Sequence, residues 1–254
     1  MAHDPSRAKV IRQRQAECDE LQRQFWDSKG IKLYQHAQAG QIAGYSFEVN
    51  FRKLIALVSA HFHLASEGKL SDEPLRQYLL EVTRRLQNFL ASASALIAQT
   101  ACFVRDSYGE SSEILTEYRQ ADERLRSKTI VAFTAKLRDF FLHARTPFIA
   151  SVMGDSEATG RDRFTLQLNL QEINSWLRRS RSHSVEVLAF EYIAVHGAEL
   201  DLQLYLLEYH QLVRQFYGWF DERNQEWSEP EWDKSLALHD AARRSHEHIY
   251  DEDP

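Results

Sequence analysis

Glycine and proline are scarce in this chain, with 9 Gly and 5 Pro among 254 residues. Both fractions lie below the usual composition of about 7% and about 5%. Because these two residues supply tight turns and interrupt helices, their scarcity favours long helices over a turn-rich β fold. Hydrophobic residues make up 43% of the chain, which is enough to bury a sizeable core.

Apolar residues recur with a helical period along most of the chain, which predicts a mainly α fold, a helical bundle in a single domain. A loop or short turn is expected from Ile31 to Tyr45, because this stretch contains Gly40 and Gly44. The expected parts are N-terminal helices (1–68), a long antiparallel helical hairpin that turns at Gly109 (71–146), a β-hairpin insertion (147–171), a C-terminal long helix (173–227), and a terminal helix with an acidic tail (228–254).

The β-hairpin is predicted from a short stretch in which the period changes. Phe164, Leu166, Leu168 and Leu170 alternate with polar residues, which is typical of a half-buried strand. The segment 148–153 is the expected partner strand, and the polar residues 154–162 between the two form the turn. The fold class is therefore mainly α with one inserted β-hairpin.

Composition limits the classes of function. The formal charge is −6, which argues against non-specific binding of duplex DNA and requires any nucleic-acid contact to be local. Cys18 and Cys102 have no neighbouring cysteine, so a disulfide framework and a zinc motif are not expected. The N-terminus lacks the layout of a secretory signal, and no apolar run is long enough to span a membrane. We therefore expect a cytoplasmic protein with no membrane partner.

The candidate catalytic residues are Arg138, Asp139 and His143, near the end of a strongly periodic helix. Arg138 is a permanently charged group with several donors suited to phosphate, and histidine is the side chain that exchanges protons near neutral pH. Asp139 lies four residues before His143, where its carboxylate could orient the imidazole. Arg138 and His143 lie about 140° apart on an ideal helix, so they converge only if the helix frays or a second subunit completes the site.

This Arg-polar-x-x-x-His pattern, on the helical hairpin of 71–146, resembles the signature of the HEPN superfamily. The resemblance implies a metal-independent endoribonuclease without a cofactor, in which two protomers each contribute the motif to a shared cleft. In that family the 2′-hydroxyl of RNA attacks the adjacent phosphate, while the His transfers protons and the Arg steadies negative charge. It also implies a homodimer, a role as a toxin or an antiphage-defence effector, and an antitoxin or regulatory protein as partner.

Arg178, Arg179 and Arg181 form the densest basic cluster and are candidate RNA-binding residues. Each motif also has a structural interpretation. Arg138 and Asp139 could form solvated ion pairs, His143 could complement the helix dipole, and the basic cluster could be a solvated linker. The alternative functions are a non-catalytic helical scaffold related to HEPN domains, and a regulatory subunit that binds RNA or a nucleotide without cutting it.

Overall fold

A computed structural model describes residues 5–109, 112–155, 162–179 and 184–250. These residues form a mainly α-helical fold with a small antiparallel sheet, which confirms the predicted fold class. The helices are α1 (Pro5–Asp27), α2 (Lys29–Ser66), α3 (Asp72–Tyr108), α4 (Glu113–Arg126), α5 (Thr129–His143), α6 (Leu170–Leu177), α7 (Ser184–His196) and α8 (Leu202–Tyr250). The strands are β1 (Ile149–Asp155), β2 (Asp162–Asn169) and β3 (Glu199–Asp201).

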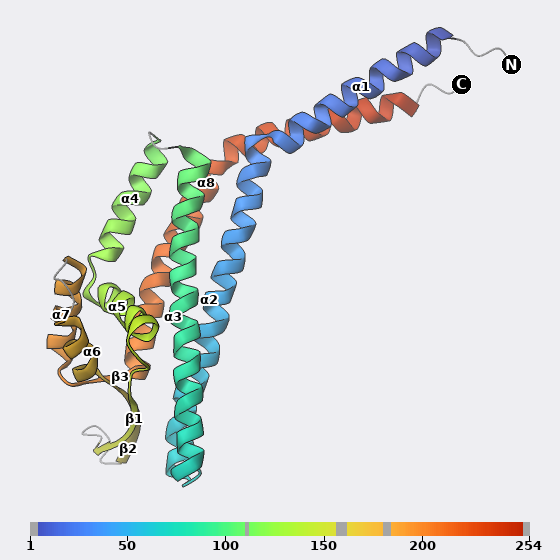
Figure 1. Ribbon diagram of the computed structural model, residues 1–254. Helices are drawn as coiled ribbons and strands as arrows, with labels where there is room; N and C mark the ends of the chain where they lie inside the picture. Colours follow the sequence, from blue (N-terminus) through green and yellow to red (C-terminus); the bar gives the residue numbers. More distant parts are fainter. Residues whose placement is uncertain (1–4, 110–111, 156–161, 180–183, 251–254) are drawn as a thin grey trace.

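The molecule consists of an elongated body and a projecting arm (Figure 1). In the body, α2 and α3 pack against each other, and the first half of α8 packs against α2. The helices α4 to α7 and the sheet lie along one side of these long helices (Figure 1). The arm consists of α1 and the second half of α8, which lie side by side and carry both ends of the chain.

The core of the body is rich in aromatic rings. Phe89 of α3 has no exposed surface, and its ring centroid lies 5.3 Å from that of Phe47, 6.0 Å from that of Phe51 and 5.9 Å from that of Tyr209. These rings come from α2, α3 and α8, so the three long helices share one apolar interior. This packing supplies the rigid frame on which the shorter elements are carried.

The prediction of a loop from Ile31 to Tyr45 is wrong, because these residues belong to α2. Gly40 and Gly44 do not interrupt the helix. A glycine in a helix costs only about 1 kcal/mol, and burial of Ile31, Leu33 and Ala43 offsets that cost. The two glycine residues therefore did not predict the structure of this stretch.

The second arm of the predicted hairpin is not one helix. It breaks at Ser127 and Lys128, where Lys128 has an extended backbone, into α4 and α5. The break turns α5 toward α7, so that the ring centroids of Phe133 and Tyr192 lie 4.9 Å apart. No glycine or proline marks this position in the sequence, and burial of the α5 face provides the reason for the break. The main antiparallel partner of α3 is accordingly α2.

The long helix predicted over 173–227 is also divided. The chain forms α6 and α7, stops at Gly197 with φ of 77°, forms β3 and then enters α8. The positive φ explains the stop, because glycine adopts this conformation without steric cost. By contrast, α8 continues through Pro230 as far as Tyr250, so the terminal helix expected over 228–254 is part of a longer one. The acidic tail of 251–254 lies outside the described residues.

The sheet confirms the predicted β-hairpin and adds a strand. β1 and β2 are antiparallel, with Ile149 opposite Leu168, and β3 pairs with the far edge of β2 through Leu200 and Leu168. Leu166 and Leu168 are buried while Thr165 and Gln167 are more exposed, as the alternation predicts. The turn was expected over 154–162, but residues 154, 155 and 162 belong to the two strands. Residues 156–161 lie outside the described part of the chain.

His61 of α2 connects this sheet to the body. Its ring is buried, and its Nε2 lies 2.9 Å from the hydroxyl of Ser151 on β1. Burial lowers the pKa of His61 below its ordinary value of 6.5, because the charged ring loses hydration. Below pH 6.5 the unfolded chain therefore binds more protons at this position than the folded chain. The contribution of His61 to stability is lost as the pH falls.

We predict that the free energy of unfolding decreases between pH 7.5 and pH 5.5, and that His61→Gln makes this decrease smaller, because glutamine cannot titrate. Urea unfolding of wild type and variant at both pH values measures the difference. His63→Gln, at an exposed position two residues away, is the matched control and should behave as wild type. Equal pH dependence in all three proteins would contradict the prediction.

The arm meets the body at an elbow formed by Ser28, Gly30, Glu231 and Ser235. The Ser28 and Ser235 hydroxyls lie 2.8 Å apart, and Ser235 donates to the backbone carbonyl of Glu231 at 2.9 Å. Gly30 is buried directly against Glu231, one residue after Pro230. The junction between α1 and α2 therefore fits closely against the proline-containing segment of α8.

Candidate functional site

The three candidate catalytic residues lie in the second half of α5. Arg138 is partly exposed, and His143, in the last turn, is exposed. Neither forms a hydrogen bond or an ion pair with another of the described residues. Because α5 remains helical through His143, the two side chains start about 140° apart around the helix. A single chain does not bring them together.

Asp139 does not orient His143 as the sequence predicts. The Asp139 carboxylate lies 3.8 Å from the Lys136 ammonium, and no hydrogen bond joins it to the imidazole. Lys136 also lies 3.0 Å from the carboxylate of Glu186, which is buried at the start of α7. The i, i+3 spacing and the second carboxylate together hold Lys136 between α5 and α7, and Asp139 is drawn toward it. The contact of Lys136 with Glu186 had no signal in the sequence, because the two residues are 50 positions apart.

The basic residues after β2 lie beside α5 because α6 runs back along it. Near the end of α5, Arg145 lies 3.2 Å from the carboxylate of Glu172, and one turn earlier the Phe140 ring packs edge-on against Trp176 with centroids 5.5 Å apart. These two contacts make the helices antiparallel. The exposed residues Arg178 and Arg179, at the end of α6, therefore lie beside the middle of α5. Arg181 lies outside the described residues.

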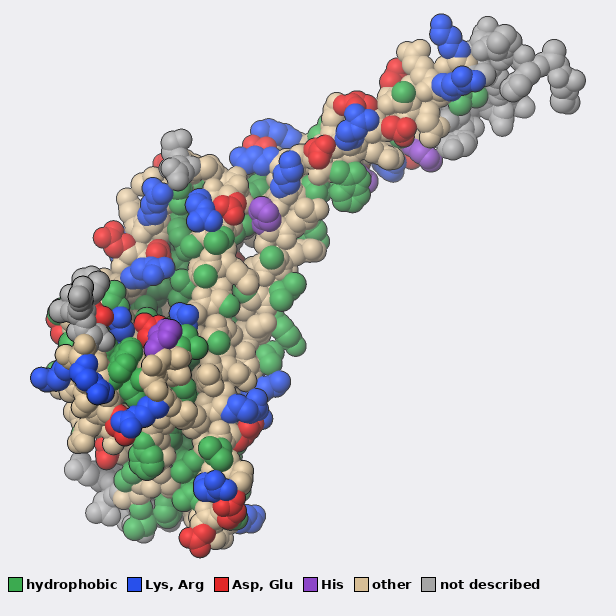
Figure 2. All heavy atoms as spheres, in the orientation of Figure 1, with side chains coloured by type: hydrophobic (Ala, Val, Ile, Leu, Met, Phe, Trp, Pro, Cys, Tyr) green, Lys and Arg blue, Asp and Glu red, His purple; other side chains and the backbone are tan. Residues whose placement is uncertain are grey.

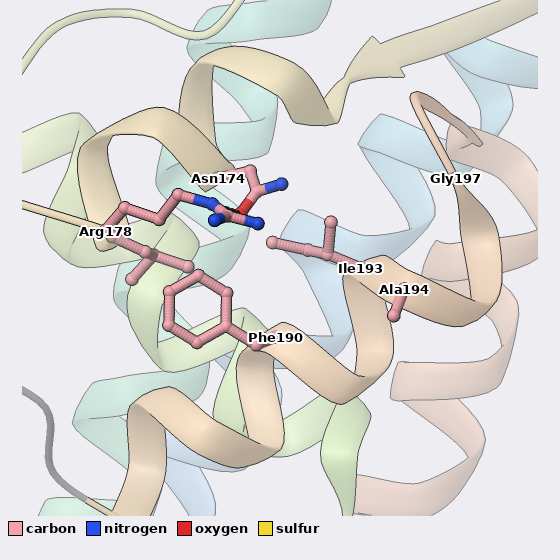
Figure 3. A pocket seen from close by; sticks show the side chains of 7 residues that line it. Asn174, Arg178, Phe190, Ile193, Ala194 and Gly197 are labelled. Carbon is pink, nitrogen blue, oxygen red and sulfur yellow. Dashed lines mark hydrogen bonds between the residues drawn. The ribbon is translucent and has the colours of Figure 1, made fainter.

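A hollow of about 610 Å³ opens between α6 and α7 next to this cluster. The Arg178 side chain extends along α6, where its Nε donates to the side-chain oxygen Oδ1 of Asn174 at 3.3 Å. Its guanidinium lies 6.0 Å from the centre of the Phe190 ring (Figure 3). Ile193 and Ala194 complete an apolar wall on α7. The hollow thus combines an aromatic face, a cation and an amide. Sequence reasoning identified only Arg178 of this set.

The surrounding face carries a local excess of positive charge, although the whole chain is acidic. Figure 2 shows several Lys and Arg side chains near a His on the face over α5 and α6, with Asp and Glu side chains among them. Arg145, Arg178 and Arg179 are exposed there. Their acidic neighbours Asp139 and Glu172 are each already paired with a cation. Such a face can bind the phosphates of a single nucleic-acid strand by charge.

The comparisons with known proteins add no family assignment. No protein-family model, curated protein or solved structure shows a significant match to this chain. Among the described residues, no helix combines the length and the apolar character that crossing a membrane requires. The function must therefore be argued from the arrangement of the residues themselves.

Proposed function

We propose that this chain is a metal-independent endoribonuclease of the HEPN type, acting as a homodimer with Arg138 and His143 as catalytic residues. The observation that carries the proposal is the return of α6 along α5, which brings an exposed basic cluster next to the Arg138 and His143 helix. Neither side chain is engaged with another described residue, so both are free to act on a substrate. The biological role that accompanies this activity is that of a toxin or antiphage effector with a neutralising partner.

The chemistry follows from the two side chains. The 2′-hydroxyl of RNA attacks the adjacent phosphorus while the bond to the 5′-oxygen of the next nucleotide breaks. His143 transfers a proton in this step, and Arg138 stabilises the negative charge that develops on the phosphate oxygens. The products are a 2′,3′-cyclic phosphate and a 5′-hydroxyl. Because the two side chains diverge on one helix, Arg138 of one protomer acts with His143 of its partner across the dimer axis.

The hollow between α6 and α7 supplies a place for an unpaired base. A base can stack on the Phe190 ring, while the Arg178 guanidinium, which lies near the same ring, contacts its edge or the neighbouring phosphate. Single-stranded RNA offers splayed bases and a 2′-hydroxyl, whereas DNA lacks the nucleophile for this reaction. The proposed substrate is therefore single-stranded RNA.

The direct test is incubation of a mixed single-stranded RNA pool with the purified protein in excess EDTA. We expect cleavage that leaves 2′,3′-cyclic phosphate ends, identified by mass spectrometry, and no cleavage of DNA of the same sequence. Light scattering during the assay reports whether the active species is a dimer. Activity that requires a divalent metal, or products with 3′-hydroxyl ends, would contradict the proposal.

We predict that Arg178→Ala/Arg179→Ala weakens binding of an uncleavable 2′-O-methyl RNA. Loss of two phosphate contacts should reduce the slope of log K against log salt by about 1.4, since each contact on a single strand contributes about 0.7. Fluorescence anisotropy at several salt concentrations measures the slope. The matched control is Arg119→Ala/Arg124→Ala, which removes two exposed charges from α4 and should leave the slope unchanged. An equal change in both double variants would refute a localised RNA contact.

The second candidate function is a helical interaction protein related to HEPN domains but without activity. The observation that favours it is the projecting arm, on which Trp26 is 61% exposed, because exposed aromatic residues are common at protein interfaces. This role predicts no cleavage of RNA by the wild type in the presence or absence of metal.

A further inference from the structure

The largest hollow described in the molecule is a groove between α2, α3 and α8, with a volume of about 810 Å³. It exists because the facing side chains are small: Ala37, Gly40 and Ala43 on α2, and Ser92 and Ala95 on α3. Three helices that cross at ordinary distances cannot fill the space between them with such residues. The groove lies in the upper half of the body in Figure 1, near the arm and away from α5.

The lining of the groove is apolar at its base and polar on one wall. Leu96 and Phe220 are buried and present apolar surface. Beside them, the Tyr217 hydroxyl lies 3.4 Å from that of Thr100, and the Asn224 side chain accepts a hydrogen bond from Tyr108 at 3.0 Å. A few fixed polar groups on a mostly apolar surface are typical of small-molecule sites, whose volumes are about 300–1,000 Å³.

The ionisable side chains of the lining are mainly acidic. They are Asp106, Asp221 and His36, and none of the lining residues is Lys or Arg. Asp106 is paired with Arg105 at 3.0 Å, whereas Asp221 forms no hydrogen bond or ion pair with any described residue. Partial removal of water by the groove walls raises the pKa of the Asp221 carboxyl above its ordinary value of 3.8. Because Asp221 has no partner among the described residues, its carboxylate is available to a cation.

We infer that the groove binds a small organic cation with an apolar body, whose ammonium group pairs with Asp221 while its apolar part lies against Leu96 and Phe220. The carboxylate selects the charge of the ligand, and the aromatic ring of Tyr217 beside it adds a cation–π contact. An anionic ligand is disfavoured because two carboxylates and no Lys or Arg line the groove. This site is independent of the proposed RNA site, and its test uses no RNA.

The probes are three dansyl compounds that share one fluorophore and differ in charge: dansylcadaverine is a cation, dansylamide is neutral and dansylglycine is an anion. We expect saturable fluorescence enhancement with dansylcadaverine and binding at least about tenfold weaker with dansylglycine, with dansylamide between them. Asp221 is exposed, so Asp221→Asn should weaken the affinity for dansylcadaverine up to about fivefold and bring the affinities of the three probes closer together. Equal binding of all three to the wild type, or no saturation with dansylcadaverine, would overturn the inference.

The groove itself is tested by filling it. A side chain added at Gly40 meets no atom within 4 Å of its first carbon, so Gly40→Trp places an indole in the groove without a backbone clash. Gly44→Trp is the matched control, because Gly44 lies one turn further along α2, has the same free space and does not line the groove. We expect loss of dansylcadaverine binding in the first variant alone, with unchanged helical circular dichroism in both.

A second pair of variants tests the groove independently, so that the result does not depend on correct folding of the glycine variants. Ala95→Trp fills the groove from α3, and Ala98→Trp places the same side chain on the same helix outside the lining. Loss of binding in Ala95→Trp but not in Ala98→Trp supports the site. Unchanged binding in both groove-filling variants, or equal loss in filling and control variants, would place the bound probe elsewhere and refute the inference.

Discussion

His143→Ala is expected to reduce RNA cleavage by about 10²–10⁴-fold, which is the usual contribution of a general acid or base. The reason is that the proposed reaction needs a group that gives and takes protons near neutral pH, and His143 is an exposed histidine on the helix that carries Arg138. The loss should appear in kcat, since the uncleaved RNA is held chiefly by charge. Single-turnover cleavage of a labelled RNA in EDTA measures it.

The stability of this variant should stay within about 0.5 kcal/mol of wild type, because His143 is exposed and bonded to no described residue. His63→Ala, which removes an exposed histidine from α2, is the matched control and should keep full activity. If His143→Ala cleaves as fast as His63→Ala, His143 is not the catalytic residue. A contaminating nuclease would also survive both changes, so the comparison exposes it.

Gly30→Ala is expected to lower the free energy of unfolding by about 1–3 kcal/mol, the usual range for overpacking a close contact. A β-carbon at this position would lie 2.5 Å from the backbone carbonyl oxygen of Glu231, and the Ser235 hydroxyl would also be displaced. A backbone atom cannot rotate away as a side chain can. The arm must therefore shift at the elbow, which breaks the contact between the hydroxyls of Ser28 and Ser235.

Urea unfolding followed by circular dichroism measures this loss. Gly44→Ala is the control, because the added carbon meets no atom within 4 Å and alanine is the better helix former. That variant should be more stable than wild type by up to about 1 kcal/mol. If the same Gly→Ala substitution lowers the free energy of unfolding at position 30 and raises it at position 44, the elbow is a close-packed junction. A stabilised Gly30→Ala would show that the arm does not pack as described.

Much of the fold could be predicted from local patterns. The spacing of Phe47, Phe51 and Leu54 identified a buried face of α2, and the alternation around Leu166 identified β2 with the correct register of inward residues. These predictions are reliable because the helical or strand period of the apolar residues directly indicates which side chains share a face. Of the candidate site, the period predicted only that Arg138 and His143 lie on a helix, and it extended this helix to 146 without the break between α4 and α5.

The sequence by itself determined that most of the chain is helical, which stretch forms a hairpin of strands and which faces of the long helices are apolar, because these depend on neighbours a few residues away. Only the tertiary structure decided the break at Ser127 and Lys128, the continuity of α2 through Gly40, and the return of α6 along α5. At Gly40 a local cost of about 1 kcal/mol is exchanged for burial of larger apolar faces, and the other two arrangements also bury rings from separate helices against each other. That exchange depends on contacts between distant segments, which a local pattern cannot specify.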